Sequence, residues 1–198
     1  MPFLGRARPL LAALLVALLV TACGGSRIPV LSFDPASACT TDGRQAGAYP
    51  DLEALLPATY QGAKPTNVDS GRNCTVQALA TLATAGIPGV RFAGATWGLG
   101  GTVGLTFAVF QADGLTPIEM IDFYGAGAQG SSKTDTLQVV DTVVVGRPAR
   151  RLDVLQGDGA MHTIVAWASL RSGVVNVLLA TDLGDTKVAD ALAELGNR

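Results

Sequence analysis

The sequence predicts an α+β domain in which an antiparallel sheet of about six strands carries helices mainly on one face. Three observations support this prediction. Apolar residues alternate with small or polar residues over several short segments, as expected for strands with one buried face. Short turns join most of these segments, and such turns favour antiparallel hairpins. Segments with helical spacing precede, interrupt and follow them, an order typical of α+β rather than α/β proteins.

Two helices are expected before the sheet. The first lies within residues 50–57, where Asp51 is a candidate N-cap and Pro57 ends the helix. The second runs from about Thr75 to Ala85, and Gly86 follows it as a C-terminal cap.

The remaining elements are predicted from the spacing of apolar residues, which changes between the helical period and the two-residue period of strands. Thr116 and Glu119 form the pattern of a capping box around Pro117, so a helix should begin there and reach about Ala128. A last helix begins near Thr186. The six expected strands are residues 90–97, 102–111, 137–145, 149–155, 161–169 and 174–181.

The N-terminus has the pattern of an export signal. Arg6 and Arg8 precede an apolar stretch, Leu10 to Val20, and small residues lead to Cys23. A positive region, a short apolar region and small residues before the cleavage point are typical of a secretory signal peptide. The apolar stretch is shorter than the roughly 20 residues of a membrane-spanning helix. We therefore expect residues 1–22 to be removed.

Val20-Thr21-Ala22-Cys23 resembles the lipobox of bacterial lipoproteins. The resemblance implies cleavage before Cys23, a diacylglyceryl thioether on its sulfur, and further acylation, for example with palmitate. It also implies a location on the extracytoplasmic side of a cell membrane, because two or more acyl chains make a stable anchor. The expected organisation is a signal peptide over 1–22, a lipid anchor and flexible tether over 23–49, and one domain over 50–198.

Two further cysteines, Cys39 and Cys74, form an even pair in a chain that is expected to be exported. Such pairs usually oxidise outside the cytoplasm, so a Cys39–Cys74 disulfide is predicted. Catalytic or metal-binding use of the pair is the alternative, although no Cys-x-x-Cys spacing or nearby histidine supports it.

Composition excludes several classes of function. The 198 residues carry a formal net charge of -2, so a nucleic-acid partner is not expected. A single histidine and no recognisable cofactor motif argue against a metal site and against a cofactor.

Four arginines are weak candidates for contacts with an anionic ligand, since a guanidinium suits carboxylates and phosphates. Arg72 lies in a polar stretch before Cys74, whereas Arg147, Arg150 and Arg151 crowd one expected hairpin. Solvated turns are the alternative interpretation. Ser70 and His162 are the only catalytic candidates, and no catalytic residues are assigned because neither has a recognisable base or acid partner in the sequence.

The order of elements loosely resembles the Mog1/PsbP-like α+β folds, including small bacterial lipoproteins. The resemblance is carried by the capped helix at Pro117, the hairpin at Val145-Gly146-Arg147-Pro148 and the closing helix. It implies a fold and no chemistry.

We therefore expect a non-enzymatic envelope lipoprotein that binds an unidentified ligand or protein partner. A purely structural lipoprotein and a lipid-anchored hydrolase are the alternatives. A cavity walled by Trp97, Trp167 or Phe107 would favour ligand binding, whereas a filled core there would not.

Replacing Cys23 with alanine should leave the protein unprocessed or released from membranes, because the thiol that carries the lipid is gone. Metabolic labelling with a clickable fatty acid checks this. Label on the Cys23→Ala protein equal to that on the wild type would contradict the lipid assignment.

Overall fold

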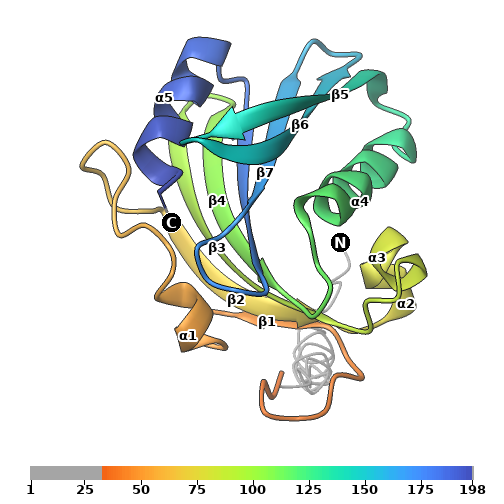
Figure 1. The fold of residues 1–198 in the computed structure, drawn as a ribbon. Helices are drawn as coiled ribbons and strands as arrows, with labels where there is room; N and C mark the ends of the chain where they lie inside the picture. Colours follow the sequence, from red (N-terminus) through yellow and green to blue (C-terminus); the bar gives the residue numbers. More distant parts are fainter. Residues whose placement is uncertain (1–32, 198) are drawn as a thin grey trace, which may run out of the picture. The chain divides into compact units, whose positions relative to one another are not determined.

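In the computed structural model, which describes residues 33–197, an eight-stranded antiparallel sheet carries helices on both faces (Figure 1). The strands run in the order β1-β2-β3-β4-β8-β7-β6-β5. Their bounds are β1 (Gly43–Gln45), β2 (Asn67–Asn73), β3 (Val90–Gly100), β4 (Val103–Gln111), β5 (Thr134–Val144), β6 (Arg147–Gln156), β7 (Met161–Ala168) and β8 (Val174–Thr181). The helices are α1 (Pro50–Glu53), α2 (Val76–Leu79), α3 (Thr81–Thr84), α4 (Pro117–Gln129) and α5 (Asp185–Leu195).

The α+β class and the antiparallel sheet are confirmed, and each of the six expected strands is present. The sheet is wider than expected because β1 and β2 add to its edge. β2 has the sequence Asn-Val-Asp-Ser-Gly-Arg-Asn, which is rich in residues that strands usually avoid. Pairing with β3 along its whole length, from Asn67 opposite Thr96 to Asn73 opposite Val90, holds it in the sheet.

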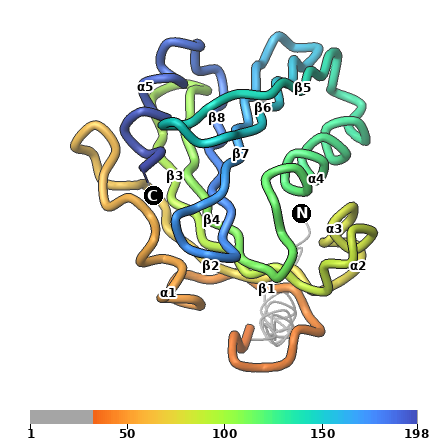
Figure 2. The backbone as a smooth tube through the Cα atoms, in the orientation of Figure 1, coloured from red at the N-terminus to blue at the C-terminus, as the bar shows by residue number. Residues whose placement is uncertain are grey.

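The two halves of the sheet meet at β4 and β8, which are far apart in sequence (Figure 2). These strands pair from Gly104 opposite Thr181 to Gln111 opposite Val174. β1 to β4 form one antiparallel run and β5 to β8 another, so this pairing makes one continuous sheet.

Asp51 is not the N-cap of α1, because Tyr49 holds that position and Asp51 lies in the first turn.

Two further helical expectations differ in detail from the structure. The expected helix over 75–85 is two short helices, because Ala80 between them has φ 46°. Thr116 is the N-cap of α4, but its side chain makes no capping hydrogen bond, so the capping box is not formed. Glu119 still lies in the first turn, where a carboxylate is favoured by the helix dipole.

Helices cover both faces of the sheet, whereas the sequence predicts coverage mainly on one. The α5 face carries α1 and α5 over a filled core that contains Phe107, Trp97 and Trp167. The Phe107 and Trp167 rings meet edge to face at 5.9 Å. The α4 face carries α2, α3 and α4 over a second cluster.

The α4 face is too wide for its helices. Eight strands at about 4.8 Å spacing make a sheet roughly 34 Å wide, whereas one helix is about 10–12 Å across. Helix α4 packs on β6 and β7, toward the β5 edge, and contacts α3 on its other flank (Figure 1). Part of the face formed by β1 to β4 is therefore left without a helix directly on it.

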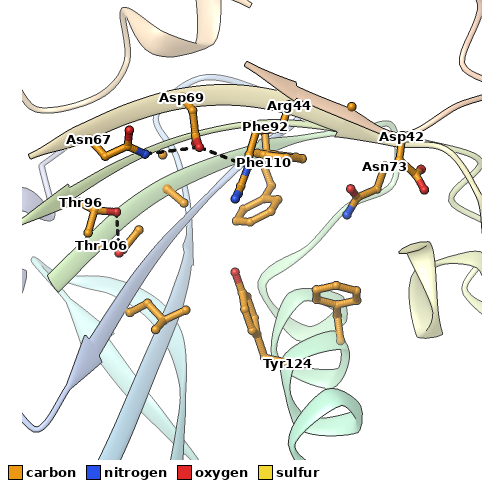
Figure 3. Close-up of a pocket in the computed structure, with 15 residues that line it drawn as sticks. Asp42, Arg44, Asn67, Asp69, Asn73, Phe92, Thr96, Thr106, Phe110 and Tyr124 are labelled. Atoms are coloured by element: carbon orange, nitrogen blue, oxygen red, sulfur yellow. Dashed lines mark hydrogen bonds and ion pairs between the residues drawn. The ribbon is translucent and has the colours of Figure 1, made fainter. Parts of the chain in front are cut away.

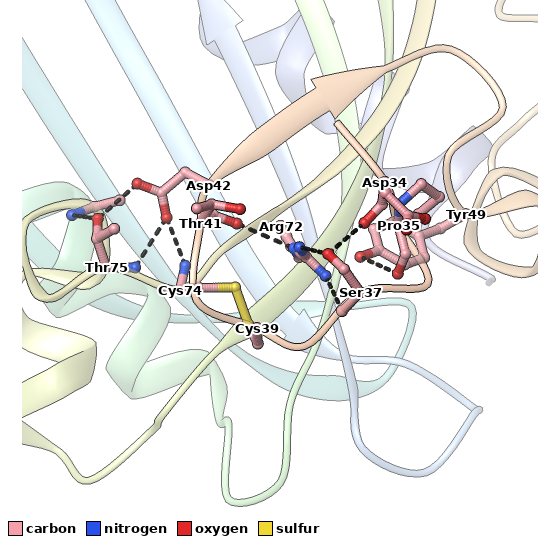
Figure 4. The surroundings of a disulfide bond; sticks show 11 residues. Asp34, Pro35, Ser37, Cys39, Thr41, Asp42, Tyr49, Arg72, Cys74 and Thr75 are labelled. Atoms are coloured by element: carbon pink, nitrogen blue, oxygen red, sulfur yellow. Dashed lines mark hydrogen bonds between the residues drawn. A yellow bond between two sulfur atoms is a disulfide. The ribbon is translucent and has the colours of Figure 1, made fainter. Parts of the chain in front are cut away.

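The compact unit begins at Phe33, earlier than residue 50, where the sequence predicts the domain to start. Residues from the expected tether pair as β1 with β2, and the Cys39–Cys74 disulfide is present (Figure 4). The expected signal peptide, 1–22, and the expected lipid attachment at Cys23 lie outside the described residues. Within residues 33–197 no helix is long and apolar enough to cross a membrane.

Removing the disulfide with Cys39→Ser and Cys74→Ser together should lower the free energy of unfolding by about 4 kcal/mol. The two cysteines are 35 residues apart, and in the chain-entropy model a loop of that length gives this value. Guanidinium denaturation of the double variant beside the oxidised and reduced wild type checks it. The reduced wild type should match the variant, and equal stability of all three would contradict a stabilising disulfide.

Candidate functional site

Arg72 lies on the α5 face of β2 and is only 3% exposed. Its guanidinium donates to the Ser37 carbonyl at 2.6 Å, the Ser37 hydroxyl at 2.8 Å and the Thr41 carbonyl at 3.1 Å (Figure 4). It also lies 5.1 Å from the centre of the Phe33 ring. Arg72 therefore holds residues 33–41 against the sheet, and its donors are used within the chain.

The three arginines of the expected hairpin lie on β6 but do not form one cluster. Side chains alternate along a strand, so Arg150 lies on the α4 face, and Arg147 and Arg151 lie on the α5 face. Arg150 pairs with Asp141 of β5 at 3.0 Å.

Arg147 and Arg151 hold the two ends of α5. Arg147 donates to the carbonyl of Gly196, the C-cap of that helix, and to the Ala168 carbonyl at 3.0 Å. Arg151 donates to both oxygens of Asp153 and pairs with Asp185 in the first turn of α5. The hydrogen bonds to Asp153 are the main reason that the pKa of Arg151 is raised, and Asp185 adds to the effect.

Ser70 and His162 are not brought together. The Ser70 hydroxyl is fully buried on the α5 face, where it accepts from the Tyr49 amide and donates to Glu53, both at 2.8 Å. His162 lies on the α4 face of β7, with its ring nitrogens 2.8 Å from the Gln156 amide nitrogen and 3.1 Å from the Thr181 hydroxyl. Among the described residues, no group of three or more His, Cys, Asp or Glu side chains could hold a metal ion.

The candidate site is a cavity of about 650 Å³ on the α4 face, in the part of the sheet that α4 leaves open (Figure 3). Its volume falls within the roughly 300–1,000 Å³ of ordinary small-molecule sites. The sheet forms its floor, and Phe123 and Tyr124 of α4 form its opposite wall. The other lining residues are Asp42, Gly43, Arg44, Asn67, Asp69, Asn73, Phe92, Gly94, Thr96, Thr106, Ala108, Phe110 and Leu179.

The floor of the cavity is made of small residues on the two middle strands. Gly94 of β3 lies opposite Ala108 of β4, and Thr96 lies opposite Thr106. A Cβ added at Gly94 would have its nearest neighbours at 3.9 Å. These short side chains leave the space above them open. Side chains on the α5 face lie on the other side of the sheet and do not fill it.

Polar groups line the side of the cavity formed by β1 and β2. Asp69 receives the Arg44 guanidinium at 3.3 Å and the Asn67 amide at 3.4 Å. Asp42 accepts from the Cys74 amide at 2.6 Å and from the amide and hydroxyl of Thr75 at 2.9 and 2.6 Å. Burial raises the pKa of Asp42, but these hydrogen bonds outweigh burial and lower it below its usual value.

Aromatic rings line the side toward α4. The Phe110 ring lies 6.0 Å from Phe92 and 6.4 Å, edge to face, from Tyr124. Tyr124 also meets Phe123 edge to face at 5.4 Å. Its hydroxyl points from α4 toward the sheet (Figure 3) and makes no hydrogen bond within residues 33–197. Burial raises the pKa of Tyr124 to about 12, and Arg44 opposes this rise.

The expected cavity beside Trp97, Trp167 and Phe107 is absent from the described residues, so that criterion does not favour ligand binding, and the cavity lies on the other face. Trp97, Trp167 and Phe107 lie in the filled core of the α5 face. The sequence signal for this cavity is a pair of strands whose side chains on one face are short. These are Gly94 and Thr96 on β3 and Thr106 and Ala108 on β4. Its polar wall could not be found because β2 has the composition of a turn.

No family model, no curated protein and no solved structure matches the chain. A function is therefore argued from the chemistry of the site.

The stability of the protein should fall between about pH 10 and pH 12 partly through Tyr124. An unfolded tyrosine ionises near pH 10, whereas folded Tyr124 keeps its proton to about pH 12. Over this interval the folded state binds more protons, so the free energy of unfolding decreases as pH rises. Urea denaturation at about pH 9 and about pH 11 should give a smaller decrease for Tyr124→Phe than for the wild type. Equal decreases would contradict the buried position of this hydroxyl.

Proposed function

We propose that the protein is a lipid-anchored cell-envelope protein whose folded unit binds a small ligand in the cavity on the α4 face. Cys23 carries the anchor, on the extracytoplasmic side of a membrane. The lipobox residues at 20–23 support the anchor, and the Cys39–Cys74 disulfide is in keeping with an exported chain.

The observation that carries the ligand-binding role is the cavity itself. Apolar rings with a few convergent polar groups are the usual composition of a small-molecule site. Here Phe92, Phe110 and Tyr124 supply rings, and Asp69 and Thr96 supply polar atoms. A domain with a purely mechanical role has no need of such a lining.

The proposed role is binding rather than catalysis. Catalysis by a nucleophile needs a base within hydrogen-bond reach. Ser70 is buried on the α5 face beside Glu53 and Tyr49, and His162 lies four strands away on the other face. In the cavity, Asp42 and Asp69 are both engaged by donors of the chain.

Filling the floor of the cavity should abolish ligand binding without unfolding the protein. Gly94→Val places a branched side chain where an added Cβ would make only ordinary contacts at 3.9 Å. A glycine inside a strand is itself unfavourable by about 0.5–1 kcal/mol relative to alanine. Native mass spectrometry of the full-length protein, purified from the envelope of the cells that make it, should detect a bound small molecule on the wild type and none on Gly94→Val.

Gly98→Val is the matched control. Gly98 lies on the same strand and the same face, does not line the cavity, and has nothing within 4 Å of an added Cβ. This variant should keep the bound species. The proposal would be contradicted if the wild type never carries a small molecule, or if Gly94→Val still carries the one found on the wild type. Either result would favour the structural alternative.

A further inference from the structure

The lining of the cavity specifies more than its size, because each of its charged side chains already has partners within the protein. The Arg44 guanidinium is paired with Asp69 at 3.3 Å and lies 5.0 Å from the centre of the Phe92 ring. The Asp42 carboxylate accepts three hydrogen bonds from Cys74 and Thr75. An anionic ligand would have to compete with Asp69 for Arg44, and a cationic ligand would have to compete with Arg44 for Asp69 and Phe92. The wall therefore favours a neutral ligand.

The floor and both sides of the cavity also carry polar atoms that still have hydrogen-bonding capacity. The hydroxyls of Thr96 and Thr106 are 3.0 Å apart and share one hydrogen bond, so each keeps an acceptor site. The amide of Asn73 and the hydroxyl of Tyr124 make no hydrogen bond within residues 33–197. A carboxylate offers about four acceptor sites, and Asp69 uses only part of them.

These polar atoms argue against an aliphatic occupant. An acyl chain would displace water from the threonines, the asparagines and Asp69 and could not replace the hydrogen bonds that the water makes. Each polar group left unsatisfied costs about 1–3 kcal/mol. The occupant must instead carry several hydroxyl or amide groups of its own.

The aromatic side completes the description. Phe123 and Tyr124 are half-buried and open onto the cavity opposite the low floor at Gly94 and Ala108. The negative face of an aromatic ring attracts weakly positive C–H groups. A sugar ring presents C–H groups on one face and hydroxyls at its edge, so it matches a site with rings on one side and polar atoms on the other.

We propose that the cavity on the α4 face binds a neutral saccharide, with Tyr124 and Phe123 against the sugar ring and the β1–β2 wall bonded to its hydroxyls. This inference rests on the proposed ligand-binding function and names the class of its ligand. The Tyr124 hydroxyl donates to a sugar oxygen, and the acceptors on Asp69, Asn67 and the threonine pair receive hydroxyl protons.

The test is isothermal titration of the full-length protein, in mild detergent, with three probes of similar size. N-acetylchitotriose is neutral, the glucosamine trimer is cationic, and trigalacturonate is anionic. The neutral trimer should bind most tightly of the three. Tyr124→Phe, which removes only the hydroxyl, should weaken its binding about 3- to 10-fold, as expected for one hydrogen bond.

Tyr60→Phe is the matched control, because Tyr60 is a buried tyrosine on the α5 face that does not line the cavity. Its affinity for N-acetylchitotriose should equal that of the wild type. Cellotriose and mannotriose serve as further neutral probes, so that the result does not depend on the acetamido group.

Three results would overturn the inference. Tighter binding of a charged trimer than of every neutral one would contradict the inference that the charged side chains of the wall are already engaged. Failure of all the saccharides to bind, while native mass spectrometry still finds a species that Gly94→Val removes, would show a ligand of another class and leave the proposed function intact. If no saccharide binds and native mass spectrometry finds no bound species, both this inference and the proposed ligand-binding function are contradicted.

Discussion

The width of the sheet is the constraint on which the rest of the structure depends. Pairing of β4 with β8 joins two antiparallel runs into one eight-stranded sheet, and such a sheet is about three times as wide as a helix. On the α5 face, α1, α5 and large rings fill the space between them. On the α4 face the middle strands carry glycine, alanine and threonine, and α4 packs toward one edge. The consequence is a cavity lined by the middle strands on one side and by α4 on the other.

The residues that attract attention in the sequence have structural roles in the folded unit. Arg72 fastens residues 33–41, and Arg147 and Arg151 hold the two ends of α5. These contacts fix the filled face. Alternation along β6 separates Arg150 from the other two arginines, so the hairpin does not bring all three together.

Periodicity predicts most of this fold and little of its site. Strand β4 alternates clearly, the apolar segments of β3 and β5 to β8 lie between turns or helices, and Pro117 marks the start of α4. β2 could not be recognised, because Asn67, Asp69 and Gly71 are turn residues that only pairing with β3 makes into a strand. The break at Ala80 depends on a positive φ that no residue type there signals. The polar wall of the cavity lies on β1 and β2, which the sequence does not predict, so a site built from β1 to β4, β8 and α4 required the structure.

A crystal structure of the full-length protein soaked with N-acetylchitotriose tests the central claim most directly. The account predicts density for a sugar ring beside Tyr124, with its hydroxyls within hydrogen-bond distance of Asp69 or the Thr96–Thr106 pair. A cavity that holds only water at a saturating concentration of the trimer, or one in which Tyr124 lies flat on Gly94 and closes the space, would contradict it.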